Sequence, residues 1–165
     1  DSTNTQAKKL AADGAAHGTI LAAEEQTAGR GRGGKRFFSP RHAGLYMSLI
    51  LKPGPGITEP QRLTLAAASA VACAIERLTG KKPGVKWVND LYLDGKKICG
   101  ILTEAVTDLE SGGIHSIILG IGVDCPRSFR ALWAASAAEL STETVWRRKL
   151  SGAFWRASKG FWIPP

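Results

Sequence analysis

One short stretch of the sequence, EEQTAGRGRGGKRFFSP at 24–40, alternates glycines with cationic side chains. Glycine lets a backbone take up positive φ and approach a ligand closely. Successive backbone N–H groups can form an anion-binding nest, and arginine adds paired donors for carboxylate or phosphate. The stretch therefore predicts a loop that covers an anionic ligand. Its cations are Arg30, Arg32, Lys35 and Arg36.

Two other interpretations of this loop stay open on the residues alone. It could be a solvated basic surface loop, or an RNA-binding segment of Arg-Gly type. The RNA interpretation is weakened because the run is short and lies between two apolar segments. The phosphate-binding pattern GxxxxGK[ST] is absent, and the setting of the dinucleotide-binding pattern GxGxxG is not met.

Two further stretches place chemically useful residues near strand ends. VKWVND at 85–90 ends in Asp90, and a carboxylate at a strand end is a plausible magnesium ligand beside phosphate oxygens. GKKICGIL at 95–102 puts Lys97 after a turn, where an ammonium group could neutralise phosphate charge. The structural alternatives are an Asx turn for Asp90 and a solvated lysine for Lys97.

The elements that must position these residues can be predicted from spacing and turn chemistry. We expect an α+β domain with a mixed β-sheet packed with helices. Asp94 and Gly95 are typical of a two-residue hairpin turn, and Thr58 with Gln61 has capping-box spacing. The predicted helices cover 2–14 and 58–80, and the predicted strands cover 17–26, 44–52, 84–88, 91–106 (as a hairpin) and 114–123.

Composition limits the class of protein. The 165 residues are 44% hydrophobic and 22% charged, enough for one domain with a core, and no apolar stretch is long enough for a membrane span. Three cysteines without a CxxC pattern favour a reducing, cytoplasmic setting over a disulfide framework or zinc site. The net charge of +8 is uneven, because residues 126–165 carry +5 of it together with four of the five tryptophans.

Six motifs in order resemble the catalytic domain of the biotin–protein ligases. They are DSTN (1–4), the loop at 24–40, GLYMSLIL (44–51), KWVND (86–90), KKICGILTE (96–104) and GIGV (120–123). The resemblance covers residues 1–125 and implies a class II aminoacyl-tRNA synthetase-like fold of the biotin–lipoate ligase type. It implies an ATP-dependent, AMP-forming ligase that makes biotinyl-5′-adenylate and transfers biotin to a lysine of a biotin carboxyl carrier protein.

The resemblance also implies roles for residues at matching positions. Arg30 and Lys97 are expected to be catalytic, and Asp90 is expected to bind Mg²⁺. Helix capping is an alternative role for Ser2 and Thr3, and packing is the expected role of Trp87 and Phe37. The implied biotin-binding set is Ser2, Thr3, Asn4, Gln26, Arg30, Gly31, Arg32, Lys97 and Gly100, and the implied ATP-binding set is Arg30, Arg32, Lys35, Asp90, Lys97 and Asp124.

The chemistry of the implied first step agrees with these residue types. A carboxylate attacks the α-phosphorus of ATP, so two anions must approach and pyrophosphate must leave. Preorganised cations and N–H groups stabilise such a transition state. No histidine lies within the motifs, so we expect the second step to depend mainly on positioning. The glycine-rich loop is expected to be mobile when empty and ordered around its ligand.

The sequence departs from the family pattern at several positions. Val88 stands in place of a common proline, Gly33 and Lys35 in place of frequent arginines, and Asp124 in place of an asparagine near the nucleotide. The family's first strand, a DNA-binding domain and the C-terminal β-barrel-like domain are not recognised. Residues 126–165 show no recognisable domain, although 142–155 could form a helix. A truncated or frame-shifted reading and a genuine lineage-specific tail both stay open.

Two rival functions remain on the sequence. A lipoate or octanoate protein ligase shares the fold, although that family lacks the GRGR loop in this form. A non-catalytic biotin- or nucleic-acid-binding remnant would fit the basic tail and Asp124. The expected acceptor is the carrier subunit of acetyl-CoA carboxylase or pyruvate carboxylase. A homodimer is left open, and no membrane partner is expected.

Overall fold

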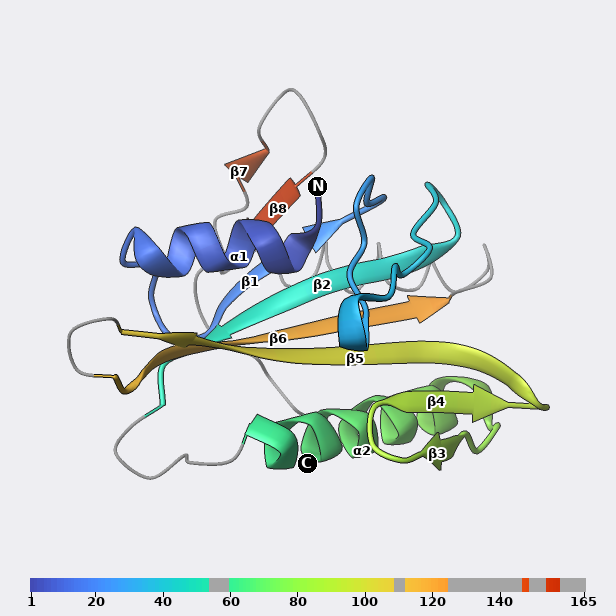
Figure 1. Ribbon diagram of the computed structural model, residues 1–165. Helices are drawn as coiled ribbons and strands as arrows, with labels where there is room; N and C mark the ends of the chain where they lie inside the picture. The colour runs from blue at the N-terminus through green and yellow to red at the C-terminus, as the bar shows by residue number, and fades with distance from the viewer. Residues whose placement is uncertain (54–59, 109–111, 125–146, 149–153, 158–165) are drawn as a thin grey trace.

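The computed structural model describes residues 1–53, 60–108, 112–124, 147–148 and 154–157 (Figure 1). Two α-helices and one short 3₁₀ helix accompany the strands in this part of the chain. The helices are α1 (Thr3–Ala12), α2 (Pro60–Thr79) and the 3₁₀ turn η1 (Arg32–Gly34). The strands are β1 (Thr19–Ala23), β2 (Gly44–Leu51), β3 (Gly84–Lys86), β4 (Asp90–Leu93), β5 (Lys96–Thr107), β6 (Ile114–Asp124), β7 (Arg147–Arg148) and β8 (Phe154–Ala157).

The strands form one sheet in the order β3-β4-β5-β6-β2-β1-β8-β7. The predicted α+β class, a sheet packed with helices, is confirmed. The described strand pairs are all antiparallel rather than a mixture of directions. Strands β5, β6 and β2 are the longest and lie at the centre of the sheet. Each has a hydrogen-bonded neighbour on both sides, which holds the site residues that it carries.

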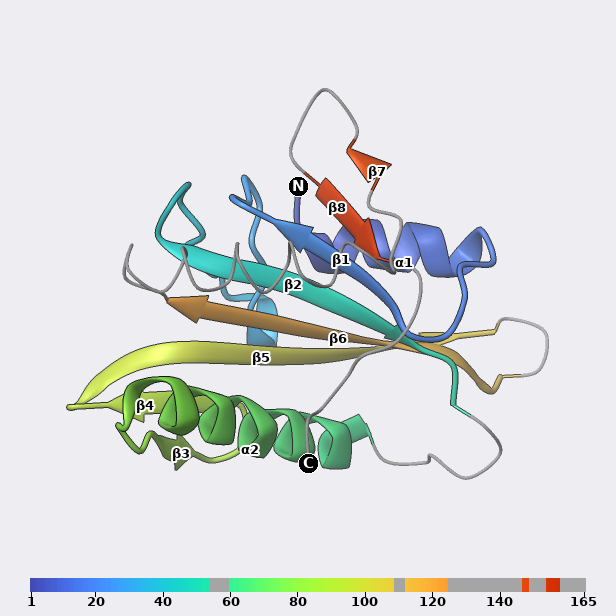
Figure 2. The same ribbon diagram turned by 180° about the vertical axis from the view of Figure 1, so that it is seen from behind.

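The two α-helices cover opposite faces of the sheet, as Figures 1 and 2 show. Ile118 of β6 packs with Ala7 and Ala11 of α1, whereas the adjacent Leu119 packs with Ala68 of α2. Neighbouring side chains of a strand point to opposite faces, so β6 is buried on both sides. Neither described helix has the length and hydropathy needed to cross a membrane.

Local sequence explains where several elements begin and end. Ser2 caps α1, since the Thr5 N–H donates to the Ser2 hydroxyl over 3.2 Å. Asp94 and Gly95 both have positive φ, at 51° and 74°, which is the backbone of the predicted two-residue hairpin turn between β4 and β5. Proline at the first position of α2 suits a helix start. The predicted cap Thr58 lies outside the described residues.

The tail differs from its prediction where the structure describes it. The sequence allowed a helix over 142–155, but Arg147–Arg148 and Phe154–Ala157 are the strands β7 and β8. Strand β8 pairs with β1, from Ile20↔Ala157 to Ala23↔Phe154, and so extends the sheet at that edge. An open sheet edge presents N–H and C=O groups that can pair with another strand. Strand β8 therefore forms its backbone hydrogen bonds with β1 rather than within a helix.

A glycine in β6 allows α1 to approach the sheet closely. A Cβ atom added to Gly120 would lie 2.1 Å from Oδ1 of Asn4, whose side chain is buried. Real atoms do not approach so closely, so the Asn4 side chain would have to leave its hydrogen bonds with Glu104 and Ser48, or the helix or the strand would have to shift. Gly84 in the edge strand β3 has no comparable neighbour, since the nearest atom to its added Cβ is the Tyr92 oxygen at 3.9 Å.

We expect Gly120→Ala to lower the free energy of unfolding by about 1–3 kcal/mol, the usual cost of forcing an extra group into a packed interior. Gly84→Ala is the matched control and should change stability by less than about 0.5 kcal/mol. Urea denaturation followed by circular dichroism measures both. Equal losses in the two variants would show that Gly120 is not the contact point of α1.

Candidate active site

The sheet face beneath α1 carries the candidate site in three rows of paired residues. The strand registers place Ser48 opposite Gly120 and Gly120 opposite Leu102, with a glycine-rich row on one side and an isoleucine row on the other. The glycines leave room above the sheet that side chains would otherwise fill. The rows across β2, β6 and β5 are Tyr46–Gly122–Gly100, Ser48–Gly120–Leu102 and Ile50–Ile118–Glu104.

The cationic loop folds back on itself above this face. The Gly31 N–H donates to the Lys35 carbonyl over 2.7 Å, and Arg30 and Arg36 form an isolated β-bridge. The loop then places the ring of Phe37 over the glycine row, within 2.5 Å of where a Cβ of Gly122 would stand. Phe37 is thus a packing residue, as predicted, and its position requires glycines beneath it. The same prediction is wrong for Trp87, which is 78% exposed.

A chain of hydrogen bonds joins the start of α1 to the loop. Oε1 of Gln26 accepts from the backbone N–H and the hydroxyl of Thr3, over 2.9 and 3.0 Å. Nε2 of Gln26 donates to the Ser39 hydroxyl over 2.8 Å. The Ser48 hydroxyl lies 2.8 Å from Thr3 Oγ1 and donates to Asn4 Oδ1 over 2.6 Å. These side chains therefore hold one another in fixed positions.

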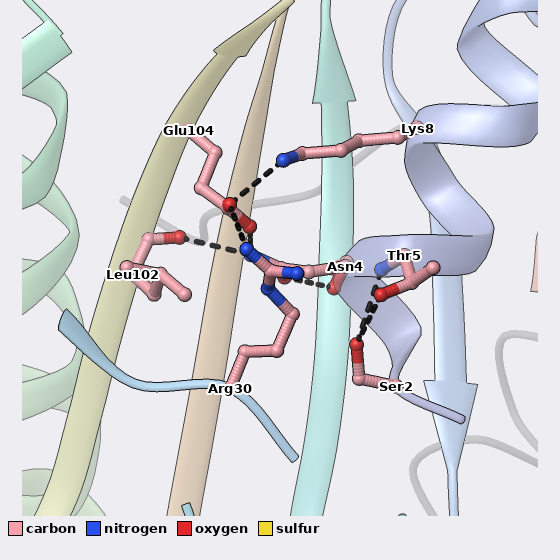
Figure 3. Close-up of polar contacts among 8 residues, drawn as sticks. Ser2, Asn4, Thr5, Lys8, Arg30, Leu102 and Glu104 are labelled. Carbon is pink, nitrogen blue, oxygen red and sulfur yellow. Dashed lines mark hydrogen bonds and ion pairs between the residues drawn. The ribbon is translucent and has the colours of Figure 1, made fainter. Parts of the chain in front are cut away.

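Glu104 of β5 gathers three donors at the edge of the site (Figure 3). Its Oε1 lies 2.7 Å from Lys8 Nζ and 3.1 Å from Arg30 Nη2, and its Oε2 accepts from Asn4 Nδ2 over 2.9 Å. Burial raises the pKa of the Glu104 carboxyl. Hydrogen bonds from Lys8 and Asn4, with the charges of Lys8 and Arg30, outweigh that effect and lower its pKa below the ordinary value.

Lys97 of β5 lies on the other side of the site and connects two cavities. Its Nζ is 2.7 Å from Asp90 Oδ1, which also accepts from Asn89 Nδ2 over 2.9 Å, and it lies 5.7 Å from the centre of the Phe37 ring. Asp124 lines the second cavity beside Lys97. Burial raises the pKa of Asp124, and the charge of Lys97 opposes that rise.

Ten of the sequence-predicted site residues lie around one cavity above the glycine row. The structure brings together all nine of the biotin set and also Asp90, from α1, the loop and strands β4 and β5. Lys35 lies in the exposed turn of the loop and lines neither of the two cavities, and Asp124 lines only the second. The ten are Ser2, Thr3, Asn4, Gln26, Arg30, Gly31, Arg32, Asp90, Lys97 and Gly100.

Several residues of the site were not predicted from the sequence. Glu104 and Ser48 lie inside recognised motifs, but only the pairing of β2, β5 and β6 shows that they face α1. Gly120 and Gly122 form the floor, and their two-residue spacing in GIGV was the signal that could have placed them on one face. The site combines an apolar floor, polar side chains fixed by mutual hydrogen bonds and three cations, Arg30, Arg32 and Lys97.

Such a site suits a ligand with an uncharged body and an anionic end. Comparison with known protein families agrees with a ligand of this kind. The model of the biotin/lipoate A/B protein ligase family matches residues 1–124, so the chain belongs to this family.

Two curated proteins are similar to this chain over about three quarters of its length. The bifunctional ligase/repressor BirA of Bacillus subtilis is 42% identical over 123 residues, which are 74% of this chain and 37% of the relative. The biotin–[acetyl-CoA-carboxylase] ligase of Paracoccus denitrificans is 37% identical over 127 residues, covering 75% of this chain and 51% of that one. The chain thus spans between about a third and a half of the length of these relatives.

Solved structures show the same architecture. The biotin protein ligase of Aquifex aeolicus in complex with biotin and ATP matches with a TM-score of 0.63 and 32% identity, over 79% of this chain and 53% of that one. The biotin protein ligase of Leishmania major in complex with biotinyl-5-AMP matches with a TM-score of 0.55 and 29% identity, over 74% and 53%.

The two shifted carboxyl groups predict opposite contributions to acid stability. Because the folded-state pKa of Glu104 lies below its ordinary value of 4.5, the unfolded chain binds more protons in that window. The stability from Glu104 is present above pH 4.5 and is lost as pH falls through the lowered pKa. Urea denaturation from pH 3 to 6 should therefore show that Glu104→Gln is less stable than the wild type by a larger margin at pH 6 than at pH 3.

Asp124→Asn is the counterpart, with the opposite sign. The folded-state pKa of Asp124 lies above its ordinary value of 3.8, so ionising this carboxyl costs stability as pH rises through the raised pKa. The variant should gain on the wild type as pH rises over the same range. Parallel pH curves for wild type and both variants would contradict the assigned environments.

Proposed function

We propose that this chain carries the adenylate-forming site of a biotin–protein ligase. It would activate biotin with ATP to biotinyl-5′-AMP, release pyrophosphate, and transfer biotin to a lysine of a biotin carboxyl carrier protein. The observation that carries the proposal is the convergence of Arg30, Arg32 and Lys97 on one cavity with a glycine floor. The similarity to ligases with bound biotin and ATP supports it.

The first step needs a carboxylate and an α-phosphate brought together against their repulsion. Arg30 and Lys97 flank the cavity from the loop and from β5, so their charges can act on both anions at once. The Gly31 N–H bonds within the loop turn, which keeps that turn narrow and brings Arg30 and Arg32 to the same cavity. Cations held before the reaction stabilise charge that develops in the transition state.

The uncharged body of biotin would lie over the glycine floor, beside the start of α1. Thr3, Asn4 and Gln26 are held by their mutual hydrogen bonds and by Ser48, which presets their polar atoms for a ligand. Ser2 is a helix cap in the structure, and it lines the cavity as well. Both expected roles of Ser2 can therefore be filled by one side chain.

A magnesium ion would be held by Asp90 together with phosphate oxygens of the nucleotide. Oδ1 of Asp90 already accepts from Lys97 and Asn89, so the ion would take the other oxygen. Within the described ranges, no three His, Cys, Asp or Glu side chains gather as a metal-binding group. That fits an ion bound mainly through nucleotide and water. Such an ion would neutralise phosphate charge.

Nucleotide binding would extend from Lys97 into the second cavity. Arg36, Lys97 and Asp124 line that cavity. Desolvation raises the pKa of Asp124, so an additional cation or hydrogen-bond donor that approaches it would stabilise its charged form. We assign Asp124 to the adenosine end, and leave Lys35 as a loop residue whose approach to phosphate would need the loop to close.

Transfer to the acceptor is the second step. A neutral amine of the acceptor lysine attacks the mixed anhydride, and AMP leaves. Positioning is the main contribution expected from the protein, because His17 and His42 are exposed and His115 lies outside the cavity. We infer that residues 1–125 act as the catalytic unit in the cytoplasm, with a carboxylase carrier domain as acceptor.

Lipoate or octanoate ligation is the second candidate, since the family as a whole includes lipoate ligases. The relatives from Paracoccus denitrificans and Mycobacterium tuberculosis, at 37% and 35% identity, are both named as biotin–[acetyl-CoA-carboxylase] ligases, which favours biotin. A non-catalytic remnant is the third candidate. It would keep ligand binding but show no pyrophosphate exchange.

Arg30→Ala should remove adenylation. Biotin-dependent exchange of ³²P-pyrophosphate into ATP, measured with Mg²⁺, should fall about 10²–10³-fold, the usual cost of losing one charge-stabilising donor. Arg77→Ala is the matched control, because it removes the same charge at an exposed position near the end of α2. No biotin-dependent exchange by the wild type would overturn the proposed function.

Lys97→Met should weaken the nucleotide side of the same reaction. The expected result is a rise in the KM for ATP together with at least about a tenfold fall in the exchange rate, since Lys97 reaches both cavities. The neighbouring Lys96→Met is the control, with the same change of charge at an exposed strand position. If both variants behave alike, the effect is one of net charge and the assignment of Lys97 is wrong.

A further inference from the structure

Glu104 is largely covered beside the site, and none of the proposed steps uses it. Its side chain is only 15% exposed, whereas that of Arg30 is 51% exposed. Figure 3 shows Lys8 from α1, Asn4 from the first turn of α1 and Arg30 from the loop all pointing at this one carboxylate of β5. This one carboxylate of β5 therefore joins α1 and the loop to the sheet.

The geometry points to Glu104 as a positioning residue: we propose that it holds the guanidinium of Arg30 over the cavity before any ligand binds. Arg30 Nη2 lies 3.1 Å from Glu104 Oε1. One guanidinium carries five donors in a planar fork, so one contact can fix the plane while other donors face the cavity. Without that contact, a half-exposed arginine on a glycine-rich loop would sample many rotamers.

The other partners of Glu104 fix the carboxylate itself. Lys8 Nζ approaches the same oxygen at 2.7 Å, and Asn4 Nδ2 donates to the second oxygen over 2.9 Å. Asn4 is in turn held by Ser48 of β2 over 2.6 Å. The carboxylate therefore cannot turn away without breaking contacts to α1, so Arg30 is anchored to the rigid sheet rather than to its own loop.

The net charge around Glu104 explains why a carboxylate at this position would not repel an anionic ligand. Glu104 contributes −1, and Lys8 and Arg30 contribute +1 each, so the cluster has a net charge of +1. The charge of Lys8 therefore offsets that of Glu104, and the charge of Arg30 stays available to the ligand. This gives two opposed expectations for Glu104→Gln. Pure electrostatics would strengthen adenylation, whereas loss of positioning would weaken it.

The first test reads the position of Arg30 without any activity. In ¹⁵N NMR spectra of the full chain without ligand, a held guanidinium shows slow rotation about its Cζ–Nε bond and separate Nη signals. We expect hindered rotation for Arg30 in the wild type and fast rotation in Glu104→Gln. Glu24→Gln is the matched control, because it removes a partly exposed carboxylate that lies 3.5 Å from Arg41 and away from Arg30.

The second test is a double-mutant cycle on biotin-dependent pyrophosphate exchange, which rests on the proposed function. Glu104→Gln should lower the rate about tenfold in the wild-type background and have no further effect in Arg30→Ala, because it acts through that arginine. A merely structural carboxylate would lower the rate equally in both backgrounds. If Glu104→Gln does not fold, Glu104→Asp keeps the charge for Lys8 and withdraws the carboxylate from Arg30 by one methylene.

The outcomes separate the two proposals. Released Arg30 rotation together with a non-additive cycle supports positioning. Unchanged rotation in Glu104→Gln, an additive cycle, or faster exchange in Glu104→Gln overturns it. If the wild type shows no exchange at all, the proposed function fails, and the NMR comparison alone still decides whether Glu104 holds Arg30.

Discussion

The start of α1 buries the polar side chains of Ser2, Thr3 and Asn4, and each needs a hydrogen-bond partner there. A buried polar group without a partner costs about 1–3 kcal/mol. Thr3 and Asn4 meet this constraint through Gln26, Ser48 and Glu104. The same bonds fix the loop, two central strands and the helix relative to one another, so the fold and the site depend on one polar network.

The glycines of β5 and β6 make that network possible. With Asn4 against Gly120 and Phe37 against Gly100 and Gly122, the helix and the loop lie close to the sheet without filling all the space between them. The remaining cavity is apolar below and cationic above. A ligand with an uncharged body and a carboxylate end matches this division, and an activated phosphate can meet the carboxylate beside Arg30 and Lys97.

The sequence was most informative where local rules dominate. Ser2 as helix cap and Asp94-Gly95 as hairpin turn need only near neighbours, and both are confirmed. Arg30 and Lys97 were found because ordered motifs marked them. Glu104 was missed because its role depends on strand register, which sets it beside α1 about a hundred residues away in the chain. Strand β8 was missed because its partner edge on β1 is equally distant.

The most direct measurement is to identify the adenylate that the protein itself makes. The chain is incubated with ATP, Mg²⁺ and equal biotin and lipoate, desalted rapidly, denatured and examined by mass spectrometry for released ligand. The proposed chemistry predicts biotinyl-5′-adenylate in an amount close to that of the protein, with little lipoyl adenylate. Lipoyl adenylate alone would assign the site to the other branch of the family, and no adenylate at all would contradict adenylation by this chain.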